Sequence, residues 1–337
     1  LKIDGSRGEG GGQILRTSVT LSCITGTPVR IVNIRRGRKV PGLRAQHLAA
    51  IRLLARVCGA RVEGLEIGSE VLEFEPGPVQ SMDLSQDIGT AGSIPLVLQT
   101  LIVPVAAASK RLKLDIMGGT DVSWSPTTDY TRYVLAAAYS RMGINFSVDV
   151  KRRGYYPRGG GRISLEVHPS RGVAAVSLTG RPGRIANLFC TYCGYSRDAI
   201  SRSVQPLLDT LERGGLQVNT LLSGEEAADK GAAVMMYTQD PASITGSDGL
   251  MGREGFPAGI SGRLLESPGT DINLSDMLVV PASIAEGTTV YRIGSISKHL
   301  ETNLYVASKI TGCKYGVGRT YDGYEIRISG RSDAGIQ

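Results

Sequence analysis

Two periodicities of apolar side chains run through this chain. In residues 42–57 (GLRAQHLAAIRLLARV) apolar positions recur every three or four residues, as at Leu48 and Ile51, which predicts an amphipathic helix. In residues 71–77 (VLEFEPG) they alternate with acidic positions, which predicts a half-buried strand. Gly59 follows the predicted helix, where a glycine can adopt the left-handed conformation that ends it.

The same order of elements occurs three times. Each copy reads helix, strand, helix, strand, strand, and a glycine follows each second helix. The second helices are predicted at residues 42–57, 127–141 and 298–310. Such a unit can form a small sheet with two helices on one face, and three units can share their helices in one interior. We therefore predict an α+β (α/β) fold with three repeated units, each of two helices and a four-stranded sheet.

Residues 180–270 interrupt this order. They contain a predicted helix at 196–214, predicted strands at 216–222 and 231–240, and a glycine-rich stretch at 243–262. We expect a smaller α/β domain inserted between the second and third copies, and a large catalytic domain formed by residues 1–179 and 271–337. The alternative is a surface excursion without a core of its own.

The composition is that of a globular protein, with 41% hydrophobic and 20% charged residues. No uninterrupted apolar run is long enough to span a bilayer, and no secretory signal is visible at the N-terminus, so a cytoplasmic location is expected. The five scattered cysteines do not fit a secreted disulfide framework. Cys190 and Cys193 have C-x-x-C spacing, but no second pair completes a zinc site.

The positive charge is concentrated in one loop. The formal net charge is +7, and residues 34–44 (IRRGRKVPGLR) contain five basic and no acidic side chains. Gly37 and Pro41 prevent a regular helix there. The loop is either a solvated basic surface or a phosphate-binding segment, for which guanidinium groups are well suited.

Residues 3–16 (IDGSRGEGGGQILR) read as a strand, a glycine-rich loop and the start of a helix. Such a loop lets the backbone approach an anion, although the spacing matches neither the dinucleotide-binding nor the Walker A motif. Glu9 within it suggests a bridging Mg²⁺ or Mn²⁺ beside phosphates; the alternative is a plain turn with an exposed glutamate. In a further loop, residues 118–130, Trp124 and Tyr130 either stack on a base or pack ordinarily.

One of the three histidines, His299, opens a predicted helix in the segment SISKHLETNLYV. A histidine there can act as nucleophile, general base or metal ligand, or it can simply cap the helix. No second histidine or cysteine lies at ligand spacing, which disfavours a metal site.

These segments together resemble the RNA 3′-terminal phosphate cyclase family. The motifs are IDGSRGEGGGQILR, IRRGRKVPGLRAQH, GTAGSIPLVLQT, GGTDVSWSPTTDY, YYPRGGGR and HLETN, in this order. The resemblance covers residues 1–179 and 271–330, and the inserted region matches loosely. It implies a ligase of RNA processing that uses ATP to convert an RNA 3′-phosphate into a 2′,3′-cyclic phosphodiester through an adenylylated histidine and an RNA-adenylate anhydride.

The resemblance also assigns roles to single residues. His299 matches the nucleophile, and Glu9 the metal ligand for Mg²⁺ or Mn²⁺. Residues expected to hold phosphates of ATP or RNA are Arg16, Arg35, Arg38 and Gln46, to which we add Arg36 from the basic loop. Residues expected at the ATP are Gln99, Pro126, Tyr130, Asn273, Asp276, Met277 and Asn303, with Tyr130 where an aromatic ring packs on adenine. Asn273 and Met277 replace an aromatic residue and a glutamine common in the family, which leaves the nucleotide preference open.

Two other functions remain as alternatives. One is a non-catalytic, cyclase-like RNA-binding factor in ribosome assembly, although such relatives lack the nucleophilic histidine. The other is an enolpyruvyl transferase, whose units are similar but which needs no covalent histidine. The expected partners are ATP and an RNA with a 3′-phosphate end; a homodimer is left open, and no membrane partner is expected.

Overall fold

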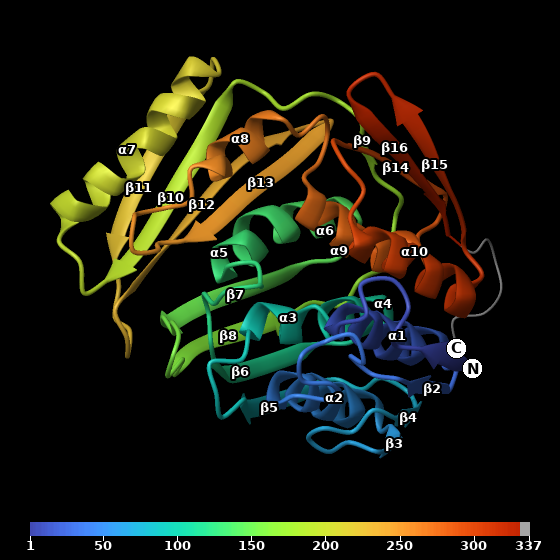
Figure 1. Cartoon of the computed structure of the whole chain (residues 1–337). Helices are drawn as coiled ribbons and strands as arrows, with labels where there is room; N and C mark the ends of the chain where they lie inside the picture. Colours follow the sequence, from blue (N-terminus) through green and yellow to red (C-terminus); the bar gives the residue numbers. More distant parts are fainter. Residues whose placement is uncertain (331–337) are drawn as a thin grey trace.

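The computed structural model of the chain describes residues 1–330. The end of the expected large domain, residues 331–337, lies outside the described residues. Within the described part the strands form four sheets of four strands each, with helices beside them (Figure 1). The predicted mixed α/β class is therefore confirmed.

The first unit follows the predicted order. Its elements are β1 (Lys2–Asp4), α1 (Gly12–Thr25), β2 (Val29–Val32), α2 (Ala45–Cys58), β3 (Arg61–Glu63) and β4 (Leu72–Glu75). The strand order is β1-β2-β4-β3, with β1 and β2 parallel and the other pairs antiparallel. Gly26 and Gly59 end the two helices in the left-handed conformation, as their positions in the sequence predict.

The second unit has the same topology with a broken first helix. Its elements are β5 (Met82–Asp87), α3 (Ile94–Leu98), α4 (Ile102–Ala107), β6 (Leu112–Gly118), α5 (Thr128–Tyr130), η1 (Thr131–Leu135), α6 (Ala136–Arg141), β7 (Phe146–Arg152) and β8 (Gly161–Val167). The first helix of this unit is interrupted between α3 and α4. Pro104 explains the break, because a proline has no N–H to donate and its ring crowds the carbonyl four residues earlier, at Thr100.

The third unit is divided by the insertion. Its elements are β9 (Ser177–Leu178), α9 (Ile272–Ala282), β14 (Thr288–Ile293), α10 (Lys298–Thr311), β15 (Lys314–Thr320) and β16 (Gly323–Ser329). The strand order is β15-β16-β14-β9. The insertion therefore follows the short first strand of this unit, β9, which the sequence pattern did not predict.

The inserted segment has its own sheet and helices. Its elements are β10 (Ile185–Cys193), α7 (Arg197–Arg213), β11 (Gln217–Gly224), β12 (Gly231–Asp240), β13 (Ser243–Leu250) and α8 (Gly259–Leu265). The sheet has the order β11-β10-β12-β13, and α7 lies along it in Figure 1. The sequence pattern missed β10, and it missed β13 because β13 is rich in glycine. Gly246 in β13 makes room for packing, since a Cβ there would lie 2.6 Å from Val134 Cγ2.

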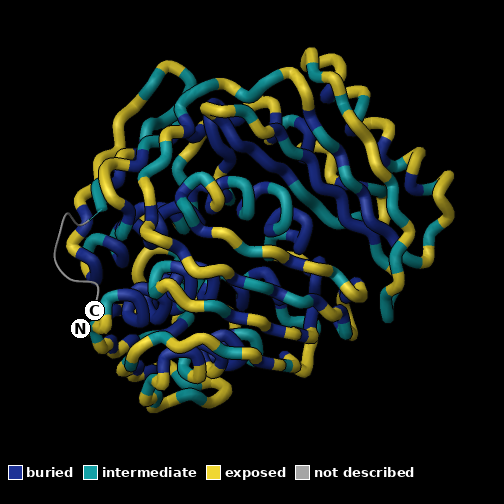
Figure 2. The backbone as a smooth tube through the Cα atoms, turned by 180° about the vertical axis from the view of Figure 1, so that it is seen from behind, coloured by how far each residue is buried: buried dark blue, intermediate teal, exposed yellow. Residues whose placement is uncertain are grey.

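Buried apolar side chains form two groups. The larger group spans the three repeated units, whose helices meet in the interior: α1 contacts α2, α4, α9 and α10. The smaller group comes from the inserted sheet and its helices. Figure 2 shows the buried backbone inside these layers and the exposed backbone around them. Because the inserted segment has a core of its own, we propose that residues 180–270 form the smaller domain.

Among the helices of residues 1–330, none combines the length and the apolar character that crossing a bilayer requires.

Candidate active site

His299 lies in the first turn of α10, at a junction of helices. Ser297 caps α10: its hydroxyl accepts a hydrogen bond from Leu300 N at 2.8 Å and donates one to Asp276 Oδ1 at 2.6 Å. One turn after the histidine, the Asn303 side-chain amide donates to the Asp276 carbonyl at 2.8 Å. Because Asp276 belongs to α9, these bonds fix the start of α10 against its neighbour.

The glycine-rich loop before α1 reaches the same turn of α10. Glu9 N donates to Thr302 Oγ1 at 3.2 Å, and Glu9 Oε2 accepts from Gly11 N at 2.8 Å. The carboxylate also forms an ion pair with Arg38. As a result Glu9 Oε2 lies 3.9 Å from His299 Nδ1. Residues almost 300 positions apart are thus brought together.

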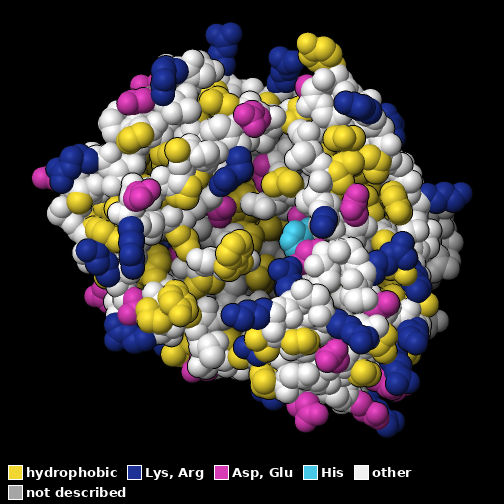
Figure 3. Space-filling model, viewed as in Figure 1, with side chains coloured by type: hydrophobic (Ala, Val, Ile, Leu, Met, Phe, Trp, Pro, Cys, Tyr) yellow, Lys and Arg dark blue, Asp and Glu magenta, His cyan; other side chains and the backbone are white. Residues whose placement is uncertain are grey.

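The surroundings of His299 favour a neutral ring. Burial lowers the pKa of His299 below its ordinary value of 6.5, and the charges of Arg16 and Arg38 lower it further. The side chain is 43% exposed, whereas its Nδ1 atom is buried and has no hydrogen-bond partner among the described residues. The exposed part of the ring therefore lies on the side away from Nδ1, which carries Nε2. A histidine side chain is visible in a hollow on the face shown in Figure 3.

A cationic cavity of about 920 Å³ opens on one side of His299. Among its lining residues are Glu9, Arg16, Arg35, Arg38, Arg44, Gln46, His47, Trp124 and His299. Among the described residues that line this wall, Glu9 is the only acidic one, and it is already paired with Arg38. A cavity with several guanidinium groups is suited to phosphate oxygens, because each planar fork can bind two of them.

The arginines of the basic loop differ in whether they line this cavity. Arg35 has a left-handed backbone (φ 55°) and donates through Nη1 to the carbonyls of Val40 and Gly42, both at 2.9 Å. It therefore shapes the loop and also lines the cavity. Arg36 donates to Asn33 Oδ1 at 3.1 Å and is not among the cavity-lining residues. Of the residues expected to bind phosphate, Arg36 is the one that this structure leaves outside the cavity.

His47 is a cavity residue that the sequence analysis did not select. Its Nδ1 accepts a hydrogen bond from Arg44 N at 3.1 Å, which leaves the proton on Nε2. Burial, followed by the charges of Arg16, Arg35 and Arg44, lowers the pKa of His47 to about 3, so the ring is a neutral donor. A Cβ at Gly12 would lie 2.5 Å from His47 Nε2, so glycine there lets the ring approach the loop. The only indication of His47 in the sequence was its position at the end of the motif IRRGRKVPGLRAQH.

A second cavity, of about 620 Å³, opens on the other side of His299. Its lining residues include Gln99, Pro126, Asn273, Asp276 and Met277, all expected at the nucleotide, together with Trp124, Asp248 and Arg263. Gln99 Nε2 lies 3.6 Å from Met277 Sδ. Burial raises the pKa of Asp276 to about 7 and that of Asp248 to about 6. Two arginines, Arg16 and Arg263, line this cavity against four in the first, so it is the less cationic of the two.

Two residues expected at the nucleotide lie beneath the cavity surface instead. Tyr130 is fully buried, and its hydroxyl donates to Asp271 Oδ1 at 2.7 Å. Its ring has no free face for adenine in this structure; it holds the carboxylate that caps α9. Asn303 is also buried, and its Oδ1 accepts from Thr17 Oγ1 at 2.7 Å. Both therefore support the wall, whereas Trp124 lies on it.

The donor set at Glu9 restricts the kind of metal site that fits. Within residues 1–330 no three histidine, cysteine, aspartate or glutamate side chains come together as ligands. A divalent ion beside Glu9 would take most of its ligands from phosphate oxygens and water, which is how Mg²⁺ binds in many nucleotide enzymes. The residues fit such a shared site and do not fit an all-protein metal cage.

Comparisons with known proteins place the chain in one family. The sequence model of the family described as RNA 3′-terminal phosphate cyclase matches residues 7–317. A protein of Caldivirga maquilingensis named RNA 3′-terminal phosphate cyclase is 40% identical over 324 residues, covering 91% of each chain. Proteins of the same name are 38% identical in Hyperthermus butylicus, over 97% of each chain, and 36% identical in Methanopyrus kandleri, over 92% of each chain. The chain therefore belongs to the RNA 3′-terminal phosphate cyclase family.

Proposed function

We propose that the chain uses ATP to close the 3′-terminal phosphate of an RNA into a 2′,3′-cyclic phosphodiester, with His299 carrying the AMP. The observation that carries this proposal is the position of His299 between two cavities, one cationic and one less cationic. When a group is transferred through a covalent enzyme intermediate, both ligands must be able to reach the nucleophile that carries it.

The two cavities suit different ligands. The smaller one, with Pro126 and Met277, suits the adenosine of ATP, and its rim reaches His299. The larger one, with Arg35, Arg38 and Arg44, suits the phosphate at the RNA end. Arg16 lines both cavities, and although burial lowers its pKa to about 10 it stays charged at neutral pH. It is therefore well placed for phosphates on either side of the histidine.

In the first step His299 acts as the nucleophile. Its lone pair is free because the lowered pKa keeps the ring neutral. We assign the attack to Nε2, since Nδ1 is buried and faces Glu9. A P–N bond to the α-phosphorus forms while the bond from that phosphorus to the pyrophosphate oxygen breaks. Pyrophosphate leaves, and Glu9 is close enough to stabilise the positive charge that develops on the ring.

In the second and third steps the AMP leaves the histidine and then the RNA. An oxygen of the RNA 3′-phosphate attacks the α-phosphorus, the P–N bond breaks, and the neutral imidazole is restored. The neighbouring 2′-OH then attacks the 3′-phosphorus and loses its proton, and the bond to AMP breaks. The anhydride is needed because a phosphate monoester dianion is a poor electrophile without a good leaving group. The arginines stabilise the phosphate charge in each transition state.

Glu9 is the residue that would hold Mg²⁺ or Mn²⁺. A bound divalent ion would neutralise phosphate charge at the point of attack. Because Glu9 is paired with Arg38, binding of the ion requires the carboxylate to exchange this partner. Glu9 is supported as the candidate because, within residues 1–330, no other acidic side chain lines the cationic cavity.

The non-catalytic alternative is less well supported. An RNA-binding factor would not require a half-exposed, neutral histidine on the wall of two cavities. The presence of His299 beside Glu9 therefore favours the enzyme.

A terminal-phosphate assay tests this function. An RNA with a 3′-phosphate is incubated with the protein, ATP and Mg²⁺ or Mn²⁺, and its phosphate is then challenged with a phosphatase. We expect the phosphate to become resistant only when ATP is present. A matched RNA whose last nucleotide lacks the 2′-OH should accumulate the RNA-adenylate instead of closing the ring. A phosphate that stays sensitive with ATP and either metal would rule the function out.

A further inference from the structure

Trp124 is the only tryptophan of the chain, and it is almost completely exposed. Its exposed fraction is 99%, and its backbone is left-handed, with a φ of 65°. A bulky aromatic residue is rarely found in this conformation. Strain of this kind persists only where the surrounding structure enforces it, and it concentrates at functional sites.

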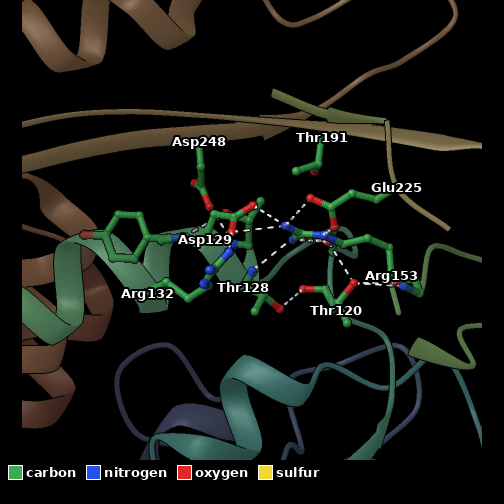
Figure 4. A network of polar contacts seen from close by, with 12 residues as sticks. Thr120, Thr128, Asp129, Arg132, Arg153, Thr191, Glu225 and Asp248 are labelled. Atoms are coloured by element: carbon green, nitrogen blue, oxygen red, sulfur yellow. Dashed lines mark hydrogen bonds and ion pairs between the residues drawn. The ribbon is translucent and has the colours of Figure 1, made fainter. Parts of the chain in front are cut away.

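The loop that carries Trp124 is fixed on both sides by buried charges. Before it, Asp121 Oδ2 accepts a hydrogen bond from Arg153 Nη1 at 3.2 Å. After it, Thr127 N donates to Asp248 Oδ2 at 2.6 Å. Asp129 also contacts the Arg153 guanidinium, and the inserted segment supplies Glu225 to the same group (Figure 4). The exposed ring thus stands on a rigid base.

The ring stands where the two cavities meet. Trp124 and His299 both line the cationic cavity and the smaller one. ATP held at Pro126 and Met277 would lie within the smaller cavity. An RNA, in contrast, has to continue from the cationic cavity into solvent, past its rim. A flat apolar surface at this rim is suited to a nucleobase, because every base has a face that stacks on an aromatic ring.

We propose that Trp124 stacks on the terminal base of the RNA and so positions its 3′-phosphate beside His299. This inference rests on the proposed function, because it takes RNA as the substrate of the cationic cavity. Stacking depends little on which base is present, so the contact would accept RNA ends of any sequence. The phosphate would be held by the arginines and the terminal nucleoside by this ring.

The fluorescence of the only tryptophan reports this contact directly. The unaltered protein is titrated with a short RNA that ends in a 3′-phosphate, without ATP, so that no transfer occurs. We expect the emission of Trp124 to be quenched. A matched RNA that keeps the 3′-phosphate but lacks the last base should leave the emission near its starting value. The proposal would be overturned if both RNAs quenched the emission equally or if neither RNA quenched it. Quenching by ATP added without RNA would also overturn it.

Substitutions give a second, independent measurement. Trp124→Ala should weaken binding of the labelled RNA about tenfold, whereas Trp124→Phe should retain most of the affinity because it keeps a ring. The exposed position makes both variants compatible with folding, which thermal melting checks. Unchanged RNA affinity in folded Trp124→Ala would contradict the proposal.

The outcome remains separable from the proposed function. Transfer of label from α-labelled ATP to the unaltered protein tests the function without any RNA. If the protein is labelled but RNA does not quench the emission, only the proposed stacking contact is contradicted. If RNA quenches the emission but the protein is not labelled, the proposed function is contradicted and an RNA-binding site remains.

Discussion

The imidazole of His299 lies 3.9 Å from a carboxylate and still has a lowered pKa. Burial and the charges of Arg16 and Arg38 lower this pKa, and the neighbouring Glu9 carboxylate is paired with Arg38. A histidine that only capped a helix would need none of these neighbours. These neighbours explain why His299 is a neutral nucleophile. The sequence motif suggested the nucleophile, but it did not show the charges and the burial that keep the ring neutral.

Strain at Trp124 can be measured by comparing two variants that both lack the ring. Alanine at position 124 keeps a Cβ in the left-handed conformation, whereas glycine adopts this conformation without strain. We expect Trp124→Gly to be more stable than Trp124→Ala by about 1 kcal/mol, from urea unfolding. Equal stabilities would mean that the backbone at this position relaxes freely.

Asp276 should give the protein a characteristic pH dependence. Burial raises its pKa to about 7, against an ordinary value of 3.8. Between these values the folded protein keeps a proton that the unfolded chain has lost, so stability falls as the pH rises. The contribution of this one group is about 1.4 kcal/mol per pH unit within that window.

Asp276→Asn cannot titrate and should flatten this slope, which urea unfolding at a series of pH values would show. Asp149→Asn is the control, because the Asp149 side chain is 63% exposed, and it should keep the slope of the unaltered protein. An identical slope in all three proteins would contradict the assignment.

At the scale of elements, the contact between the glycine-rich loop and α10 determines the distance from Glu9 to His299. Gly8 has a φ of 68°, and a Cβ there would collide with Thr302 Oγ1, the acceptor for Glu9 N. Gly26 has a similar φ of 66° at the end of α1, and nothing lies within 4 Å of its Cβ position. A side chain at either glycine would strain the backbone, but only at Gly8 would its Cβ also collide with a neighbour.

We expect Gly26→Ala to destabilise the protein by about 1 kcal/mol through its backbone alone. Gly8→Ala should cost at least about 1 kcal/mol more, because Thr302 must move and release its hydrogen bond. Gly8→Ala should also slow the labelling of the protein by ATP, and Gly26→Ala should not. Thermal unfolding and the labelling rate measure the two effects, and equal behaviour of the variants would contradict this view of the loop.

The element scale was also where the sequence was most informative. The second helices of all three units, such as α2 and α10, occur close to their predicted positions because apolar spacing and a terminal glycine agree there. The interrupted helix at α3 and α4 and the glycine-rich strand β13 were not predicted. Pro104 breaks the first pattern locally, whereas in β13 close tertiary contact at Gly246 replaces the usual strand residues.

At the scale of the whole molecule, the inserted segment is joined to the repeated units by charge pairs. Arg153 is fully buried and pairs with Asp121, Asp129 and Glu225, the last at 2.7 Å (Figure 4). Arg158 also crosses this boundary, pairing with Asp229 at 2.8 Å, but it is 68% exposed. Both arginines therefore form ion pairs across the boundary, but the Arg153 side chain is buried and the Arg158 side chain is exposed.

Replacing Arg153 by Met should destabilise the protein by about 3–5 kcal/mol, because buried carboxylates lose their partner. Arg158→Met should cost less than about 1 kcal/mol, since solvent screens an exposed pair. Urea unfolding followed by circular dichroism compares the two variants. Similar losses would show that burial does not control the strength of this junction.

The candidate site could be predicted in part at this scale. Ordered motifs identified residues from four separate segments, and Glu9, Arg38, Gln99 and His299 do meet around the two cavities. The sequence could not show that Tyr130, in α5, faces inward while Trp124, in the loop before α5, faces solvent, because the path of this segment depends on Arg153. It also could not select His47, whose Nε2 approaches Gly12 in a loop more than 30 residues earlier.

The most direct test of the account is transfer of label from α-labelled ATP to the protein in the presence of Mn²⁺ and without RNA. A phosphoramidate predicts an acid-labile label on the unaltered chain and none on His299→Ala that melts like the unaltered protein. Equal labelling of the two proteins, or no label on the unaltered chain, would contradict a histidine-bound adenylate.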